Sequence, residues 1–263
     1  MSFLETMIAH RSERIGAQYG TLTPADRERL ACCARSVRDF SAALRDRGDV
    51  AVIAEVKKAS PSEGAIAPEC EASKQALHYQ DGGAAAISVL TEPESFGGSF
   101  TDLSDVADAV DIPVLCKDFV VDPVQAFVAR GHGADAILLM VSVLGGLTAE
   151  YVDTARTLGL APVVEVIDVS ELRIALGSGA EVIAVNSRNL HTLAVDGDAA
   201  REVISEAERS GTIVVAASGV STRADVEAAA EAGAHAVLVG TALMRSAFPE
   251  DVLMELTGVP RRP

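Results

Sequence analysis

The stretch that decides the fold is VAVIAEVKKASPSEG, residues 50–64, in which an apolar run ends in Glu55, Lys57 and Lys58 and then in a Ser-Pro-Ser turn. A nearly unbroken hydrophobic run of this length is typical of a parallel strand that is buried on both faces. Because strand side chains alternate between faces, Glu55 and Lys57 point to the same side. Taken alone, the stretch allows two interpretations: an ion pair that caps a strand, or the floor of a catalytic site.

Strand and helix patterns alternate from this stretch to the end of the sequence. Further strands are predicted at residues 85–90, 113–117, 136–140, 162–166, 182–185, 213–217 and 236–239. Glycine followed by alanine recurs where a predicted helix meets the next strand, at Gly83, Gly133, Gly179 and Gly233. Small residues at these junctions are expected to let the helix and strand backbones approach closely. Eight strand–helix units in 263 residues favour an α/β fold of the closed (β/α)8 TIM barrel type, with an open doubly wound sheet as the alternative.

A helical extension is predicted before the first strand. Residues 3–15 form one helical segment, and Thr23-Pro24-Ala25-Asp26 supplies an N-cap, a proline at the first helical position and an acid for a second. A third segment contains Phe40 and Leu44. The expected organisation is a helical extension packed on the barrel (residues 1–49), the barrel itself (50–258) and a short tail (259–263).

The charge and composition argue against several classes of partner. The sequence has 22 basic and 38 acidic residues, a formal net charge of −16, and such a surface repels nucleic acids and acidic membranes. Aromatic residues make up only 4% and tryptophan is absent, which argues against stacking on bases. The apolar stretch at residues 136–149 is too short and too interrupted to span a bilayer, and no secretory signal is visible.

The cysteines and histidines show no metal-binding pattern. Cys32, Cys33, Cys70 and Cys116 lack the spacing of metal ligands, and the five histidines share no common spacing. Free thiols in a reducing cytoplasm are therefore expected. We predict a cytoplasmic protein that acts on a small molecule, binds no metal, and is a monomer or a weak homo-oligomer.

In a TIM barrel the reactive groups lie at the C-terminal ends of the strands. The polar candidates at these ends are Glu55, Lys57, Lys117, Glu165, Asn186 and Arg188. Only four lysines occur beside eighteen arginines, so lysine at two strand ends is informative, because an amine can act as a proton donor near neutral pH where a guanidinium cannot. Glu165 ends a buried apolar run, which is costly for an acid unless it has a partner.

The last two loops and two phenylalanines suggest the two ends of a ligand. Ser218-Gly219-Val220-Ser221 and Gly240-Thr241 each follow a buried strand and open a helix, in the loops that usually hold phosphate in this fold. Ordinary turn chemistry is the alternative interpretation of these loops. Phe96 and Phe119 add aromatic surface near the mouth, either for a flat apolar ligand group or as anchors of their loops.

From residue 40 to residue 244 the sequence resembles the indole-3-glycerol phosphate synthase family. The resemblance rests on seven motifs in order: IAEVKKASPS at 53–62, LT with FGGS at 90–99, PVLCKDF at 113–119, VEV at 164–166, NSRNL at 186–190, SGV at 218–220 and LVG at 238–240. The helical extension also suits this family.

The resemblance implies ring closure, decarboxylation and dehydration of 1-(2-carboxyphenylamino)-1-deoxyribulose 5-phosphate, without a metal or organic cofactor. It implies Lys117 as the general acid, Glu165 as its basic counterpart and Lys57 as the partner of the substrate carboxylate. Glu55 and Asn186 would orient these groups. The implied binding residues are Ser60, Ser218, Gly219, Gly240 and Thr241 at the phosphate, and Phe96, Phe119, Leu190 and Arg188 at the anthranilate ring.

The sequence departs from the family pattern at one position. The family commonly has Ser-Glu-Ser-Gly or Ala-Glu-Ser-Gly at the end of the seventh strand, whereas this sequence has Ala216-Ala217-Ser218-Gly219. A carboxylate expected beside the two lysines is therefore missing at Ala217. Two alternatives stay open: another barrel enzyme acting on a phosphorylated sugar, such as an isomerase, and a paralogue with altered specificity or with binding but no turnover.

Overall fold

The computed structural model describes residues 2–32, 35–188 and 196–262. Its centre is a closed barrel of parallel strands, in which β1 pairs with both β4 and β10, so the predicted TIM barrel is confirmed and the open sheet is wrong. The barrel strands in the described part of the chain are β1 (Ala51–Val56), β4 (Ala86–Leu90), β5 (Val114–Lys117), β6 (Ala136–Met140), β7 (Ala161–Val166), β8 (Val182–Asn186), β9 (Ile213–Ala217) and β10 (Ala236–Val239).

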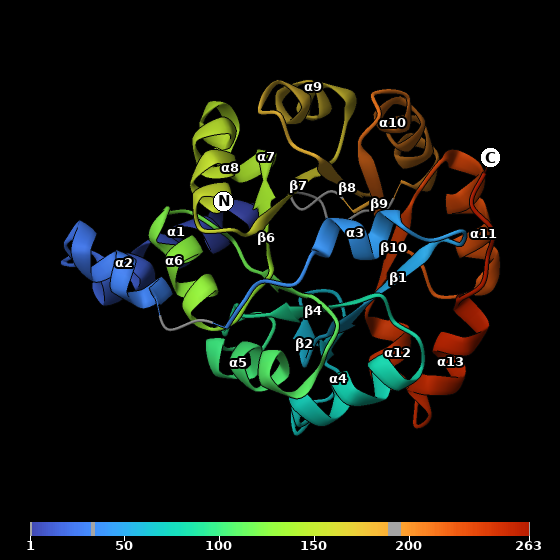
Figure 1. The fold of residues 1–263 in the computed structure, drawn as a ribbon, viewed down its shortest axis with the longest axis horizontal. Helices are drawn as coiled ribbons and strands as arrows, with labels where there is room; N and C mark the ends of the chain where they lie inside the picture. The colour runs from blue at the N-terminus through green and yellow to red at the C-terminus, as the bar shows by residue number, and fades with distance from the viewer. Residues whose placement is uncertain (1, 33–34, 189–195, 263) are drawn as a thin grey trace.

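Helices form an outer ring around these strands (Figure 1). The ring consists of α4 (Ala72–Asp81), α5 (Phe100–Ala109), α6 (Val124–Gly131), α8 (Thr148–Thr157), α9 (Val169–Gly177), α10 (Gly197–Arg209), α11 (Arg223–Ala232) and α13 (Pro249–Leu256). Short elements follow three strands: α7 (Val141–Leu144) and a 3-10 turn (Gly145–Leu147) after β6, α12 (Thr241–Arg245) after β10, and the antiparallel pair β2 (Ala59–Ser60) and β3 (Gly64–Ala65) after β1.

Three helices precede the barrel, as the sequence predicts: α1 (Phe3–Tyr19), α2 (Pro24–Cys32) and α3 (Phe40–Arg45). In Figure 1, α3 lies in front of the strands in the middle of the ring of helices. Phe40 and Leu44 of α3 are buried against the residues that fill the barrel interior. The third helix therefore closes the N-terminal end of the barrel and leaves the other end open.

The repeated glycines end helices for a reason that differs from the predicted one. Gly83, Gly133, Gly179 and Gly233 all have positive φ, between 75° and 101°, a conformation that favours glycine after a helix. A Cβ would meet a neighbouring atom closer than 3.0 Å at Gly133 and Gly233 but not at Gly83 or Gly179. The left-handed turn explains all four glycines, and a close side-chain neighbour, Ala107 or Glu208, adds a second reason at Gly133 and Gly233.

The strands alternate between two hydrophobic clusters. Ala51 and Ile53 of β1 belong to the cluster inside the barrel, whereas Val52 and Ala54 pack toward the surrounding helices. The same alternation runs through β5, β7 and β8, where Leu115, Val163, Val182 and Ala184 point inward. The next inward positions along these strands are Glu55, Lys117, Glu165 and Asn186. Strand periodicity thus directs four polar side chains into one mouth.

Candidate active site

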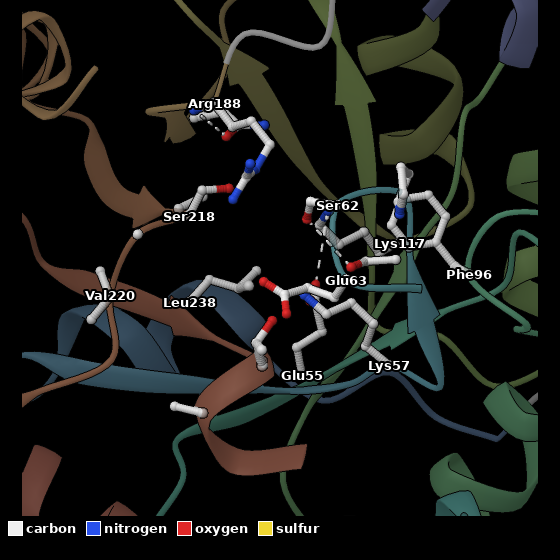
Figure 2. Close-up of a pocket in the computed structure, with 18 of the residues that line it drawn as sticks. Glu55, Lys57, Ser62, Glu63, Phe96, Lys117, Arg188, Ser218, Val220 and Leu238 are labelled. Atoms are coloured by element: carbon white, nitrogen blue, oxygen red, sulfur yellow. Dashed lines mark hydrogen bonds and ion pairs between the residues drawn. The ribbon is translucent and has the colours of Figure 1, made fainter. Parts of the chain in front are cut away.

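The predicted polar residues surround one cavity of about 350 Å³ at the C-terminal ends of the strands (Figure 2). In Figure 2, Ser218 and Val220 lie on one side of this cavity and Phe96 on the other, with Glu55 and Lys57 between them. Such a cavity is large enough for a small organic ligand. Its described lining contains four cationic side chains, Lys57, Lys117, Arg188 and Arg245, and three carboxylates, Glu55, Glu63 and Glu165. The cavity is therefore locally positive in a strongly acidic protein.

Glu55 lies between the two lysines. Its Oε2 is 3.2 Å from Lys57 Nζ and its Oε1 is 3.8 Å from Lys117 Nζ. Burial alone would raise the pKa of the Glu55 carboxyl, but the charges of Lys57 and Lys117 outweigh it and leave the pKa below its usual value. Glu55 is therefore ionised at neutral pH and holds the two ammonium groups close to each other.

Glu165 and Asn186 form a second polar pair on neighbouring strands. Asn186 Nδ2 donates to Glu165 Oε1 at 3.1 Å, and the backbone N–H of Arg188 donates to Asn186 Oδ1 at 3.0 Å, which fixes the orientation of the amide. The other carboxylate oxygen, Glu165 Oε2, is buried and has no hydrogen-bond partner among the described residues. A buried acceptor without a partner is costly, so this oxygen is suited to bind a ligand group or a proton.

The loop after β9 presents backbone donors to the cavity. Ser218 has φ 66° and Gly219 has φ 77°. Among the described residues, Ser218 is the one residue other than glycine that has a positive φ. Strain of this kind is characteristic of functional sites. Within the described residues, no acceptor takes the backbone N–H of Gly219 or Val220. Successive free N–H groups in such a turn make a concave site for an anion.

The loop after β10 and the loop after β1 complete this end of the cavity. Ser60, Gly240 and Thr241 all line it. A Cβ at Gly240 would lie 2.6 Å from Glu55 Oε2 and 3.2 Å from Lys57 Nζ, so a side chain at this position would displace the floor of the site. Glycine at residue 240 is therefore required by close packing against the catalytic candidates.

The aromatic side of the cavity has two layers. Phe96 lines the cavity, and Phe119 lies behind it with ring centroids 6.2 Å apart. Phe3 of α1 also lines the cavity and meets Phe119 edge to face at 6.4 Å. The N-terminal helix thus supplies part of the wall, which the sequence analysis did not predict.

A buried ion pair holds α1 against the mouth. Arg11 Nε donates to Asp118 Oδ1 at 2.9 Å, and Arg11 Nη2 donates to Asp118 Oδ2. Thr91 and the backbone of Phe119 donate to the same carboxylate. Because Asp118 directly follows Lys117, the helix that carries Phe3 is fixed to the strand end that carries the candidate acid.

The structure brings together twelve of the fourteen predicted site residues as lining of the one cavity. These are Glu55, Lys57, Ser60, Phe96, Lys117, Glu165, Asn186, Arg188, Ser218, Gly219, Gly240 and Thr241. Phe119 packs behind Phe96 instead, and Leu190 lies outside the described residues. The lining that sequence reasoning missed includes Phe3, Glu63 and Arg245. None of the three carries a local sequence signal, because the packing of Phe3 on Phe119 and the pair of Glu63 with Arg245 join segments far apart in the sequence.

The described residues show neither a metal-binding cluster nor a membrane-spanning helix. They contain no group of three or more His, Cys, Asp or Glu side chains arranged to hold a metal ion. Among the helices of that part of the chain, none is both long and apolar enough to cross a membrane.

The fold and the site together define a TIM-barrel protein with paired lysines and carboxylates at its mouth and an anion-binding end beside them. The sequence model of the indole-3-glycerol phosphate synthase family matches residues 4–256. The chain belongs to this family.

Individual relatives agree with this assignment. The chain is 42% identical to indole-3-glycerol phosphate synthase 1 of Streptomyces coelicolor over 264 aligned positions, covering 100% of this chain and 97% of that protein. It is 48% identical to indole-3-glycerol phosphate synthase of Mycobacteroides abscessus over 83% of this chain and 80% of that protein. Among solved structures, 3-hexulose-6-phosphate synthase has a TM-score of 0.64 at 19% identity over 79% of this chain and 98% of that chain, which supports the fold alone.

Proposed function

We propose that this protein is an indole-3-glycerol phosphate synthase, a carbon-carbon lyase of tryptophan biosynthesis. It would convert 1-(2-carboxyphenylamino)-1-deoxyribulose 5-phosphate to indole-3-glycerol phosphate with loss of carbon dioxide and water. Membership of the family supports this proposal. One observation carries the proposal: Lys57 and Lys117 both form ion pairs with Glu55 at the centre of the cavity. One end of this cavity has backbone donors for an anion, and the other end is aromatic.

Lys117 is the proposed general acid of ring closure. The ring carbon that bears the carboxylate attacks the ketone carbon of the ribulose chain, and the ketone oxygen takes a proton from Lys117. Glu55, whose Oε1 is 3.8 Å from Lys117 Nζ, positions the ammonium group for this transfer. Loss of carbon dioxide then restores the aromatic ring.

Lys57 and Glu165 are the proposed partners in the remaining steps. Lys57 pairs with the substrate carboxylate before decarboxylation and is close enough to the centre to donate a proton when water leaves. Glu165 removes the proton that is lost with that water, and its buried Oε2 is the oxygen available for this role. Asn186 holds the other oxygen of Glu165 and so aims the carboxylate.

The two ends of the cavity match the two ends of this substrate. The N–H groups of Gly219 and Val220, with Ser60, Ser218, Gly240 and Thr241 around them, form the proposed phosphate site. Phe3 and Phe96, backed by Phe119, form the proposed wall for the anthranilate ring, with Arg188 on the same lining. The proposal includes no metal or organic cofactor.

The setting of the enzyme is also part of the proposal. We propose that it works in the cytoplasm, as a monomer or a weak homo-oligomer. Cys32, Cys70 and Cys116 are free thiols in the structure, which agrees with a reducing compartment.

The direct test is turnover of the purified protein. The carboxyphenylamino-deoxyribulose phosphate is added, and indole fluorescence is followed together with release of carbon dioxide. We expect both signals at the same rate. A well-folded protein that forms no indole product would refute the proposal, and complementation of a tryptophan-requiring strain that lacks the synthase would test it in cells.

A further inference from the structure

The loop between β1 and α4 brings a carboxylate, Glu63, into contact with α12, the helix that begins with the proposed phosphate-binding residue Thr241. β2 and β3 pair as a short antiparallel ribbon, and Pro61, Ser62 and Glu63 at its tip line the cavity (Figure 2). A carboxylate at this place repels a phosphate, so it requires an explanation.

Glu63 forms an ion pair with Arg245. Arg245 Nη2 donates to Glu63 Oε2, and both side chains line the cavity although they are 182 positions apart in the sequence. Arg245 is the last residue of α12, which begins at Thr241 beside Gly240. The guanidinium therefore belongs to the short helix that begins with Thr241, and Gly240 is the residue just before that helix.

The pair is exposed enough to exchange partners. The side chain of Arg245 is 58% exposed and that of Glu63 is 32% exposed, and ion pairs with such exposure are held weakly. A phosphate carries nearly two negative charges and can accept two parallel hydrogen bonds from a guanidinium. A phosphate that enters the cavity is therefore a stronger partner for Arg245 than Glu63 is.

We propose that Arg245 binds the phosphate of the substrate and that Glu63 competes with this phosphate for the guanidinium. The inference rests on the proposed function, because it assigns the phosphate group of that substrate to this end of the cavity. Lys57 and Lys117 are engaged with Glu55 at the floor, and Arg188 lies just after the end of β8. Arg245 is the cation that α12 itself carries to the cavity lining.

The competition predicts effects of opposite sign for the two partners. Removal of the Glu63 charge releases Arg245 and removes a repulsion, so phosphate should bind more tightly. Removal of the Arg245 charge deletes the binding group, so phosphate should bind more weakly. If Glu63 acted only through Arg245, its removal would have little effect once Arg245 is gone.

The test measures binding of inorganic phosphate to the intact protein by calorimetry, with Glu63→Gln, Arg245→Gln and the double variant. We expect Glu63→Gln to lower Kd several-fold and Arg245→Gln to raise it about tenfold, the scale of one lost charge-assisted hydrogen bond. In the double variant the gain from Glu63→Gln should largely disappear. Glu227→Gln is the control, because Glu227 pairs with Arg223 on the exposed surface of α11 and does not line this cavity.

With the full substrate, KM should follow the phosphate Kd while kcat stays nearly constant, as expected for binding that does not change during the reaction. Weaker phosphate binding by Glu63→Gln, or an equal gain with and without Arg245, would overturn the inference. These outcomes are separate from the proposed function, because inorganic phosphate binds without turnover. Turnover by the wild type combined with unchanged phosphate binding in Arg245→Gln would overturn only the assignment of Arg245.

Discussion

The two ends of the barrel use ionic groups in different ways. At the closed N-terminal end, Asp135 is buried, and its carboxylate accepts hydrogen bonds from Arg35, Arg38 and the backbone of Val114. At the open end, Glu55 Oε1 and Glu165 Oε2 are buried without hydrogen-bond partners among the described residues. The carboxylate at the closed end already accepts hydrogen bonds at both of its oxygens. Each of the two carboxylates at the open end has an oxygen that can still accept one.

The two ends of the barrel also differ in the cationic residues that they use. Arginines surround Asp135, and the buried atoms without a partner there include the donors Arg35 Nε and Arg130 Nη1. Lysines stand at the open end. An arginine keeps its proton under all physiological conditions, whereas lysine and glutamate can give and take protons. The closed end is thus built for stability and the open end for chemistry, as is usual in TIM barrels.

The largest expected effect of a single substitution is on turnover, at the open end. Lys117→Met should lower kcat by about 10²–10⁴-fold, because the reaction loses its proposed general acid. The free energy of unfolding should change much less than the activation barrier, since buried Glu55 keeps Lys57 as an ionic partner. Steady-state kinetics and denaturant unfolding test the two parts separately. Lys74→Met is the control at an exposed lysine on α4, and a Lys117→Met variant that kept a tenth of the wild-type kcat would contradict the assignment.

The closed end should show the reverse response. Asp135→Asn should reduce the free energy of unfolding by about 3 kcal/mol, because Arg35 and Arg38 lose a buried partner. At a temperature where the variant is folded, kcat should remain near the wild-type value. Urea unfolding monitored by circular dichroism gives the first quantity. Asp198→Asn, which removes an exposed partner of Arg201, should leave stability nearly unchanged. Comparable losses in the two variants would remove the distinction between the ends.

Ala217→Glu should raise the catalytic efficiency of the site at the open end. Ala217 is the inward position at the end of β9, opposite Asn186 and Leu238 in the strand register, and it lines the cavity. A carboxylate there supplies the acceptor that the family pattern has, so kcat/KM should rise about tenfold, the scale of one charged hydrogen bond. Ala217→Gln is the control, because glutamine has nearly the same shape as glutamate but no negative charge. A fall in kcat/KM for Ala217→Glu would show that the present site is organised around the alanine.

A further expected effect, on stability and not on turnover, concerns pH and Glu171 in the first turn of α9. Burial, together with the charges of Asp168 and Glu165, raises the pKa of Glu171 to about 7. The folded state therefore binds more protons than the unfolded state between about pH 4.5 and pH 7, and stability falls as pH rises through this range. Glu171→Gln should weaken this dependence, seen as a smaller loss of Tm between pH 5 and pH 8. Parallel Tm curves for wild type and variant would contradict the expected titration.

Much of the fold could be predicted because strand patterns are local. The predicted bounds of the strands at residues 136–140, 213–217 and 236–239 agree with the structure, and those at 85–90, 113–117, 162–166 and 182–185 each differ by one residue at one end. Parallel strands buried on both faces appear as apolar runs, and the side chain that follows on the inward face is then fixed by alternation. That is why Glu55, Lys117, Glu165 and Asn186 could be placed in one mouth from the sequence.

The residues that escaped prediction depend on tertiary contacts. Phe3 reaches the cavity only because Arg11 docks on Asp118, and no local pattern encodes such a contact. Glu63 and Arg245 meet across 182 positions, and each alone has the appearance of an ordinary surface charge. Phe119 was expected on the lining, but the ring of Phe96 stands in front of it. Periodicity predicts on which face of a strand or helix a side chain lies, but it does not predict whether the side chain reaches the cavity or is covered by another residue.

The ion pair between Arg11 and Asp118 also sets the order in which the molecule is completed during synthesis. The two residues are 107 positions apart, so α1 leaves the ribosome long before its acceptor exists. Until the loop after β4 and then β5 emerge, the face of α1 that carries Leu4 and Met7 lacks residues on which it packs in the folded protein. The first segment to be translated therefore cannot complete its docking until residue 118 has emerged, at a point where strands β6–β10 are still to be made.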